Sequence, residues 1–227
     1  MNEIIDRYTR SRLLFGDTFT HIQNTKVILF GVGGVGGFAL DCLYRSGVKH
    51  ITIVDKDYFD VTNQNRQIGA EHINEAKVRV LAQMYPGIIP MQEAVNAEFL
   101  KTFDIMKFDY IIDAIDDIYA KVEIAKIAQD KPMGHYIVST GSAKKLSPLH
   151  IQVDSIWKTH GDKFARKLRD HLKKAGIKKA FKAVFSPEKP KCKPLGSFSA
   201  VTASFGLTIA SEVIQHILKE NDYAKQL

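Results

Sequence analysis

Four closely spaced glycines, in Gly-Val-Gly-Gly-Val-Gly at residues 31–36, are the first candidates for a ligand site in the chain. An apolar run at 27–30 precedes them and a helical pattern follows at 38–43. A strand, a glycine turn and a helix bring backbone N–H groups and the positive end of a helix dipole to a phosphate. A second apolar run ends on Asp55, 55 − 36 = 19 residues after the last glycine, close to the roughly 20 expected for a ribose-binding carboxylate. The motif predicts an adenine-nucleotide site and leaves NAD, FAD and ATP open.

Two cations further along the chain distinguish between these nucleotides. Arg66 and Lys77 follow the second predicted strand, and Asp116 stands at the C-terminal end of a third, beginning at residue 110. An enzyme that uses ATP as a reagent needs cations, because negative charge builds up at the phosphorus under attack. Arginine offers a planar fork and lysine a point charge, while a carboxylate beside a triphosphate indicates Mg²⁺. We therefore predict ATP and Mg²⁺ at this site.

The order of these residues resembles the ThiF/MoeB/HesA superfamily, the relatives of ubiquitin-activating enzymes. The opening Arg-Tyr-Thr-Arg at residues 7–10 is similar to the start of those proteins. Within the superfamily, residues 61–68, 112–116, 164–169 and 201–206 resemble the branch of bacterial tRNA threonylcarbamoyladenosine dehydratases. The resemblance covers nearly the whole chain, although the segment 186–195 is shorter than in those enzymes.

The resemblance implies roles for individual residues. Gly33 and Gly34 would line the phosphates, and Asp116 would hold Mg²⁺. Arg10 would reach the ATP site of a partner subunit, which implies a homodimer. The predicted catalytic residues are Arg10, Arg66, Lys77 and Asp116. The predicted nucleotide-binding residues are Gly31, Gly33, Gly34, Gly36, Asp55, Asp57, Asn63, Arg66, Lys77 and Asp116.

Charge is concentrated between residues 158 and 193, where 13 lysines and arginines stand against 3 acids. Phe164, Leu168 and Leu172 recur at helical spacing, and Gly176 is placed to end the helix. We expect a helix with one buried stripe and a basic face that binds a polyanion, here tRNA. The predicted tRNA-binding residues are Lys163, Arg166, Lys167, Arg169, Lys173 and Lys174.

The cysteines bear on the alternatives. ThiF/MoeB-type activators commonly carry two C-x-x-C pairs that hold zinc, and this sequence has no such pair, so we expect no zinc. Cys192 lies between lysines in a proline-spaced loop and is a poor candidate for a thioester-forming nucleophile. The alternative of an adenylyltransferase for a ubiquitin-like or sulfur-carrier protein is disfavoured but stays open, as does docking of a sulfur-transfer protein. A Rossmann dehydrogenase is disfavoured by Arg66, Lys77 and Asp116.

The expected fold class is α/β, with a doubly wound Rossmann-like sheet and helices on both faces. A helical arm (1–23) precedes an ATP-binding core (24–144). A C-terminal α+β extension with the basic helix (145–227) belongs to the same domain. The N-terminus lacks the pattern of a signal peptide. The apolar helix expected at 198–218 carries several polar residues, so we interpret it as a core or dimer-interface helix. We expect a cytoplasmic enzyme, without a membrane span, that activates a carboxylate with ATP. The resemblance implies cyclising dehydration of threonylcarbamoyladenosine in the tRNA anticodon loop.

Overall fold

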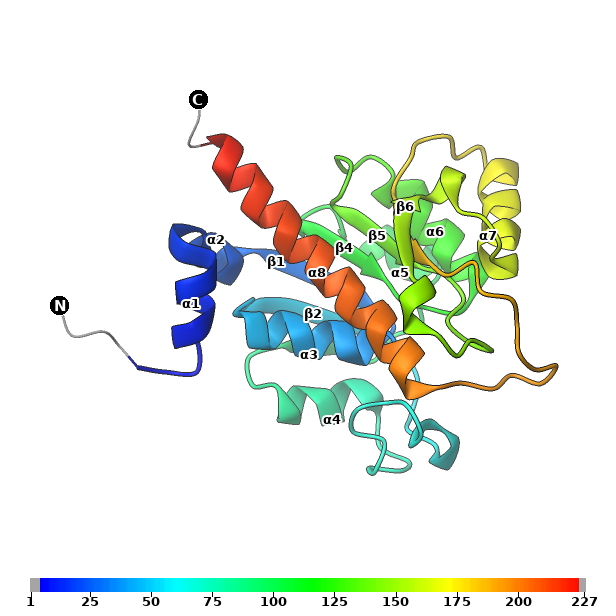
Figure 1. The fold of residues 1–227 in the computed structure, drawn as a ribbon, viewed down its shortest axis with the longest axis horizontal. Coiled ribbons are helices and arrows are strands. Elements are labelled where there is room, and N and C mark those ends of the chain that lie inside the picture. The colour runs from blue at the N-terminus through cyan, green and yellow to red at the C-terminus, as the bar shows by residue number, and fades with distance from the viewer. Residues whose placement is uncertain (1–4, 225–227) are drawn as a thin grey trace.

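A seven-stranded sheet forms the centre of the computed structural model, which describes residues 5–224 (Figure 1). The strand order is β3-β2-β1-β4-β5-β7-β6, and all neighbours are parallel except the pair β6 and β7. The strands are β1 (Lys26–Phe30), β2 (His50–Val54), β3 (Ile89–Met91), β4 (Tyr110–Asp113), β5 (Tyr136–Ser139), β6 (Gln152–Ser155) and β7 (Lys182–Phe185). The order reverses between β1 and β4, and ligands of such sheets bind at this switch point.

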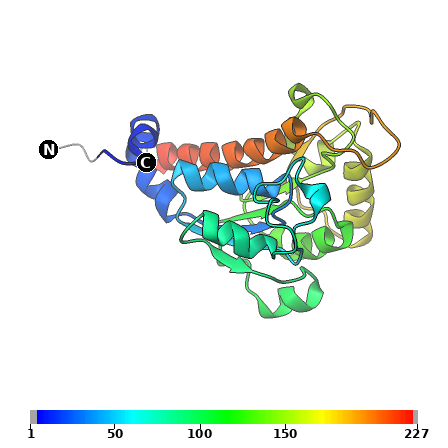
Figure 2. The same cartoon turned by 90° about the horizontal axis from the view of Figure 1, so that it is seen from below.

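Helices cover both faces of the sheet (Figures 1 and 2). One face carries α3 (Gly36–Ser46), α4 (Lys77–Met84) and α8 (Ser199–Ala224), and the other carries α5 (Ala97–Thr102), α6 (Ile118–Ala128) and α7 (Lys163–Lys174). Successive residues of β1 serve both layers: Leu29 packs in the first core and Ile28 in the second. Central parallel strands buried on both faces explain the continuous apolar runs in the sequence. The predicted α/β doubly wound fold is confirmed.

The N-terminal arm divides into two parts. Its first helix, α1 (Thr9–Phe15), leaves Leu13 and Leu14 exposed by 74% and 78%. Its second helix, α2 (Phe19–Asn24), buries Phe19 and Ile22, and Ile22 belongs to the core that underlies α3 and α8. The second helix therefore anchors the arm, while α1 presents apolar side chains to solvent.

The C-terminal extension continues the same sheet, because β7 pairs with β5 and β6 with β7. A 3₁₀ turn (Pro148–His150) precedes β6, which begins at Gln152. The last helix, α8, is longer than expected and packs chiefly along α3. Gly206 permits this contact, since a Cβ there would lie 2.2 Å from the carbonyl oxygen of Val35.

Among the described residues, only α8 is long and apolar enough to cross a membrane by length and composition, with a mean hydropathy of 1.2 over its best window. Half of that window is buried inside the protein. Core helices of soluble proteins pass the same test, so the burial of α8 against α3 accounts for its apolar composition.

Candidate nucleotide-binding site

A cavity of about 480 Å³ lies where β1, β2, β4 and β5 end. Gly31, Gly33 and Gly34 line it, whereas Gly36 begins α3 and does not. A Cβ on Gly36 would lie 1.8 Å from the carbonyl oxygen of Gly31, so this glycine lets the turn close on itself. Gly31 has φ of 81°, and a Cβ there would lie 2.9 Å from the backbone of Ala114. The cavity has the size of a small-ligand site.

The Asp55 carboxylate is fixed at the end of β2. One of its oxygens accepts a hydrogen bond from the backbone N–H of Val32 (2.8 Å), and the other from that of Asp57 (2.9 Å). Burial raises the pKa of Asp55, and the nearby Lys77 opposes that shift. A carboxylate has about four acceptor positions, so Asp55 keeps acceptor capacity for hydroxyl groups of a ligand.

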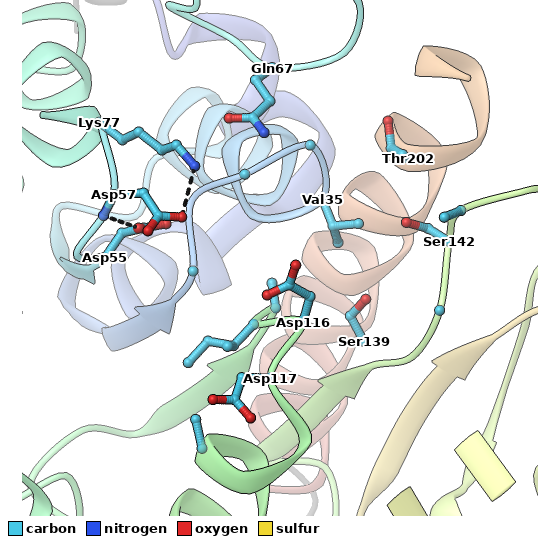
Figure 3. Close-up of a pocket in the computed structure, with 18 of the residues that line it drawn as sticks. Val35, Asp55, Asp57, Gln67, Lys77, Asp116, Asp117, Ser139, Ser142 and Thr202 are labelled. Carbon is cyan, nitrogen blue, oxygen red and sulfur yellow. Dashed lines mark hydrogen bonds and ion pairs between the residues drawn. The ribbon is translucent and has the colours of Figure 1, made fainter. Parts of the chain in front are cut away.

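Lys77 and Arg66 both line the cavity. Lys77 is the first residue of α4 and is only 6% exposed, and its Nζ lies 3.2 Å from Oδ2 of Asp57 (Figure 3). Asp57 thus supplies the counter-charge that holds the lysine in place. Arg66 is half-buried beside Gly34, and its Nη1 donates to the carbonyl oxygen of Thr62 (2.8 Å). Two cations with fixed positions therefore face the glycine turn.

Asn63 lies outside the cavity lining. Its Oδ1 accepts from the backbone N–H of Asp60 (3.2 Å), completing a capping box around the 3₁₀ turn Val61–Asn63. The predicted contact of Asn63 with a triphosphate therefore competes with a structural hydrogen bond. Gln67, which sequence analysis did not select, lines the cavity instead, and its Oε1 is buried without a hydrogen-bond partner. A buried orphan acceptor at a cavity wall is a candidate ligand contact.

Asp116 lies in the loop after β4 and lines the cavity opposite Lys77 and Gln67 (Figure 3). The strand ends earlier than expected, at Asp113, because Asp117 caps α6 by accepting from the N–H of Tyr119 (2.8 Å).

A buried ion pair supports the loop that carries Asp116. Oδ1 of Asp113 accepts from Nζ of Lys121 in α6 (2.8 Å) and from the backbone N–H of Ile115 (3.2 Å). Both side chains of the pair are at most 1% exposed. Burial raises the pKa of Asp113 and lowers that of Lys121, while each partner favours the charged form of the other.

A second buried ion pair connects the cavity to α7. Nζ of Lys145 lies 2.9 Å from Oδ2 of Asp162, which also accepts from the hydroxyl of Thr140 in the cavity wall (2.9 Å). Oδ1 of Asp162 caps α7 by accepting from the N–H groups of Phe164 and Ala165. Phe164 itself lines the cavity. The basic helix therefore begins at the rim of the nucleotide cavity.

The predicted helix is present as α7, and Leu168 and Leu172 of its apolar stripe are buried. Phe164, the third predicted member, is half-buried at the cavity, and Ala165 is buried beside it. Five of its six selected cations are exposed, namely Lys163, Arg166, Lys167, Lys173 and Lys174. Arg169 is half-buried, and its Nη1 donates to the carbonyl oxygen (2.8 Å) and to the hydroxyl of Thr159. Arg169 thus ties α7 to the preceding segment, and its predicted contact with tRNA competes with this role.

Arg10 lies in α1 and is exposed. Figure 1 places α1 at the opposite end of the molecule from α7, and Arg10 does not line the cavity of its own chain. A role for Arg10 in nucleotide chemistry therefore requires a second subunit.

A doubly wound sheet with a glycine turn, a fixed carboxylate and two cations at its switch point defines a nucleotide-binding α/β protein. The chain matches the ThiF family model over residues 8–227 and belongs to that family. It is 36% identical over 198 residues to a tRNA threonylcarbamoyladenosine dehydratase of Bacillus subtilis, covering 82% of this chain and 77% of that protein. An adenylyltransferase and sulfurtransferase of Kluyveromyces lactis is 29% identical over 137 residues, 57% of this chain and 30% of that protein.

Solved structures extend the similarity to the whole fold. The crystal structure of the Escherichia coli tRNA N6-threonylcarbamoyladenosine dehydratase TcdA in complex with ATP superposes with a TM-score of 0.87 at 28% identity, covering 96% of each chain. The same enzyme in complex with AMP gives a TM-score of 0.86. The similarity therefore includes the extension that carries β6, β7 and α7 as well as the glycine turn.

Proposed function

We propose that this protein is an ATP-dependent tRNA threonylcarbamoyladenosine dehydratase. The observation that carries the proposal is the similarity over 96% of both chains to a dehydratase in complex with ATP, combined with the cation-lined cavity at the switch point. A dinucleotide dehydrogenase has no need of two fixed cations beside the phosphate turn, whereas an enzyme that attacks a phosphorus atom does.

The residues of the cavity fit a nucleoside triphosphate. The N–H groups of the turn at 31–36 and the N-terminus of α3 would receive phosphate oxygens. Lys77 and Arg66 would stabilise charge on the phosphorus under attack, and the orphan Oε1 of Gln67 would accept a hydrogen bond from the ligand. Asp55 would accept from the ribose hydroxyls. We infer that these groups select ATP over NAD and FAD.

Asp116 is the residue that would hold Mg²⁺, because its exposed carboxylate faces the cavity opposite Lys77 (Figure 3). When bound, the ion would neutralise charge on the phosphate oxygens. The Asp113–Lys121 pair would act as a positioning device, since it fixes the loop from which Asp116 projects.

The proposed reaction joins two steps at this site. A carboxylate oxygen of the threonylcarbamoyl group attacks a phosphorus of ATP, forming a mixed anhydride as the first leaving group departs. A nucleophile of the same modified base then attacks the activated carbonyl carbon, closes a ring and expels the phosphate-containing group, with net loss of one water. The protein contributes alignment and charge stabilisation, so no covalent enzyme intermediate is needed.

We also propose that α7 receives the tRNA, that two subunits form a homodimer, and that the enzyme acts in the cytoplasm. The five exposed cations of α7 begin next to the cavity, which would place a bound polyanion beside ATP. The exposed Leu13 and Leu14 of α1 would be covered in a dimer that brings Arg10 to the partner's cavity. The proposal of Arg10 acting in trans rests on this placement.

The proposal is tested by mass spectrometry of tRNA nucleosides from cells that lack the gene. We expect threonylcarbamoyladenosine to accumulate at the expense of a form that is lighter by one water. Wild-type protein should restore the lighter form, whereas Asp116→Ala should not. Asp130→Ala, which changes an exposed aspartate paired with Lys179, serves as the matched control and should restore it.

The result that would overturn the proposal is an unchanged nucleoside profile in the deleted strain. The alternative, adenylylation of a ubiquitin-like or sulfur-carrier protein, would then be examined by ATP–pyrophosphate exchange. Exchange that depends on such a carrier protein and not on tRNA would establish the alternative.

A further inference from the structure

A cluster of two histidines and a glutamate lies away from the nucleotide cavity, where β4 and β5 begin. His135 immediately precedes β5, and His216 and Glu220 stand four residues apart on α8. One nitrogen of each histidine and one carboxylate oxygen lie within 4.8 Å of one another. Residues four apart on a helix project from the same face. The side chains of His216 and Glu220 therefore both point from α8 toward His135 at the start of β5.

The ring of His135 is oriented by the backbone. Its Nδ1 lies 2.9 Å from the carbonyl oxygen of Asp109, which can only accept, so Nδ1 carries the proton. The other ring nitrogen, Nε2, lies 3.0 Å from Oε1 of Glu220. Nε2 and Oε1 both belong to groups that bind metal ions through a lone pair. A carbonyl that fixes the tautomer is the usual outer partner of a metal-binding histidine.

The ring of His216 is held by packing. Its Nε2 lies so close to Gly134 that a Cβ on this glycine would come within 2.5 Å of it. Its Nδ1 faces the cluster, 3.5 Å from Oε2 of Glu220.

Tyr110 adds one proton to the cluster and cannot satisfy all of its acceptors. Its hydroxyl lies 2.8 Å from Nδ1 of His216 and 3.2 Å from Oε2 of Glu220, and it donates to one of them at a time. One nitrogen of each histidine and a carboxylate oxygen of Glu220 therefore converge on one position.

We propose that Nε2 of His135, Nδ1 of His216 and the Glu220 carboxylate bind one divalent transition-metal ion of the Zn²⁺ class. Two imidazoles and one carboxylate suit zinc better than Mg²⁺ or Ca²⁺. A hollow of about 280 Å³ adjoins His135 and Glu220, with room for water in the remaining coordination position. The ion would cross-link the last part of α8 to the start of β5.

This site differs from the four-cysteine zinc site that the sequence lacks, and it is independent of the proposed function. The expectation of no zinc rested on the missing C-x-x-C pairs, and it did not consider this cluster. The spacing of His216 and Glu220 is visible in the sequence. The contribution of His135, 81 residues earlier (216 − 135), emerges only from the fold.

The test uses the full chain without an affinity tag, stripped with a chelator and titrated with Zn²⁺ by calorimetry and with Co²⁺ by visible absorption. We expect one ion per chain and a Co²⁺ spectrum of low coordination number. Glu220→Gln keeps the shape of the side chain and should weaken Zn²⁺ binding about tenfold or more, as even outer-shell changes typically do. Glu212→Gln, on the same helix but paired with Lys182, is the matched control and should bind like wild type.

A second measurement separates metal binding from folding. Zn²⁺ should raise the Tm of wild type and of Glu212→Gln, and should raise that of Glu220→Gln much less, with all three showing the same circular dichroism without metal. Equal Zn²⁺ affinity in the two variants would mean adventitious surface binding and would overturn the proposal. Absence of Zn²⁺ binding in wild type would also overturn it.

Discussion

The nucleotide cavity and the basic helix α7 meet at Phe164, but they hold their positive charges in different ways. Lys77 is almost fully buried and is fixed by Asp57, whereas the five exposed cations of α7 form no ion pair among the described residues. A fixed, desolvated charge acts strongly on one position and costs no reorganisation during the reaction. Exposed charges on long side chains act as a field that salt screens. The fixed cation of the cavity therefore suits stabilisation of charge at one position, whereas the exposed cations of α7 suit electrostatic attraction of a polyanion.

The largest expected effect is on stability, and it comes from the buried ion pair Asp113–Lys121 that supports the cavity. Lys121→Met leaves Asp113 buried without its partner, so we expect a loss of about 3–5 kcal/mol in the free energy of unfolding. Urea unfolding followed by circular dichroism measures it. Lys126→Met, an exposed lysine of the same helix paired with Glu123, should change stability by less than about 0.5 kcal/mol. Similar losses in both variants would contradict a structural role for the pair.

The next effect is on the chemistry. Lys77→Ala should lower ATP turnover by about 10²–10³-fold, the loss typical of removing one preorganised charge-stabilising donor. Asp116→Ala should also lose turnover and keep its fold, because the side chain is exposed and supports no packing. Arg79→Ala, an exposed cation on the same helix as Lys77, is the matched control. Turnover measured at saturating ATP that stays within threefold of wild type in Lys77→Ala would remove the lysine from the mechanism.

The sequence predicts the cavity better than its supports, for a physical reason. The turn at 31–36 and Asp55 form a local pattern whose spacing reflects one strand–helix–strand unit. The buried ion pairs Asp113–Lys121 and Lys145–Asp162 depend on which helices pack under the loops. The spacing of these residues in the sequence does not predict that they pair. Asn63 illustrates the converse, because its motif position agrees with a ligand contact while a capping box occupies its side chain.

The difference between local patterns and long-range contacts also explains which secondary-structure elements the sequence predicts. Long periodic segments such as α7 and α8 are predictable from their apolar stripes. The short strands β3 and β7 hold three and four residues, too few for a periodicity to appear. His135, just before β5, and His216 on α8 are brought together only by the fold, so their spacing in the sequence does not reveal the cluster around Glu220.

A third prediction tests whether the cavity is complete within one chain. Arg10→Ala and Lys77→Ala subunits should each be inactive as homodimers. In a verified heterodimer one cavity has all its cations, so activity should recover to at most half that of wild type. Turnover is compared for the purified heterodimer and a mixture of the two unexchanged homodimers. No recovery above that mixture would contradict supply of Arg10 in trans.

The smallest and most graded effect is expected on α7. Neutralising Arg166, Lys167, Lys173 and Lys174 together should weaken tRNA binding and leave ATP affinity unchanged. Each lost phosphate contact should reduce the log–log salt slope by roughly 0.7–0.9. Arg169→Gln should instead lower stability through its bonds to Thr159 and leave the slope unchanged. Filter binding across a salt series measures both, and an unchanged slope in the quadruple variant would make α7 a solvated face.

The proposed dehydratase activity is tested most directly by measuring ATP consumption and loss of water from tRNA in the same reaction. Purified protein is incubated with tRNA that carries threonylcarbamoyladenosine, with ATP and with Mg²⁺, and nucleosides and nucleotides are quantified together. We expect one ATP to be consumed for each nucleoside that becomes lighter by one water, with neither change in Lys77→Ala. ATP consumption without the mass change, or the mass change without ATP, would contradict it.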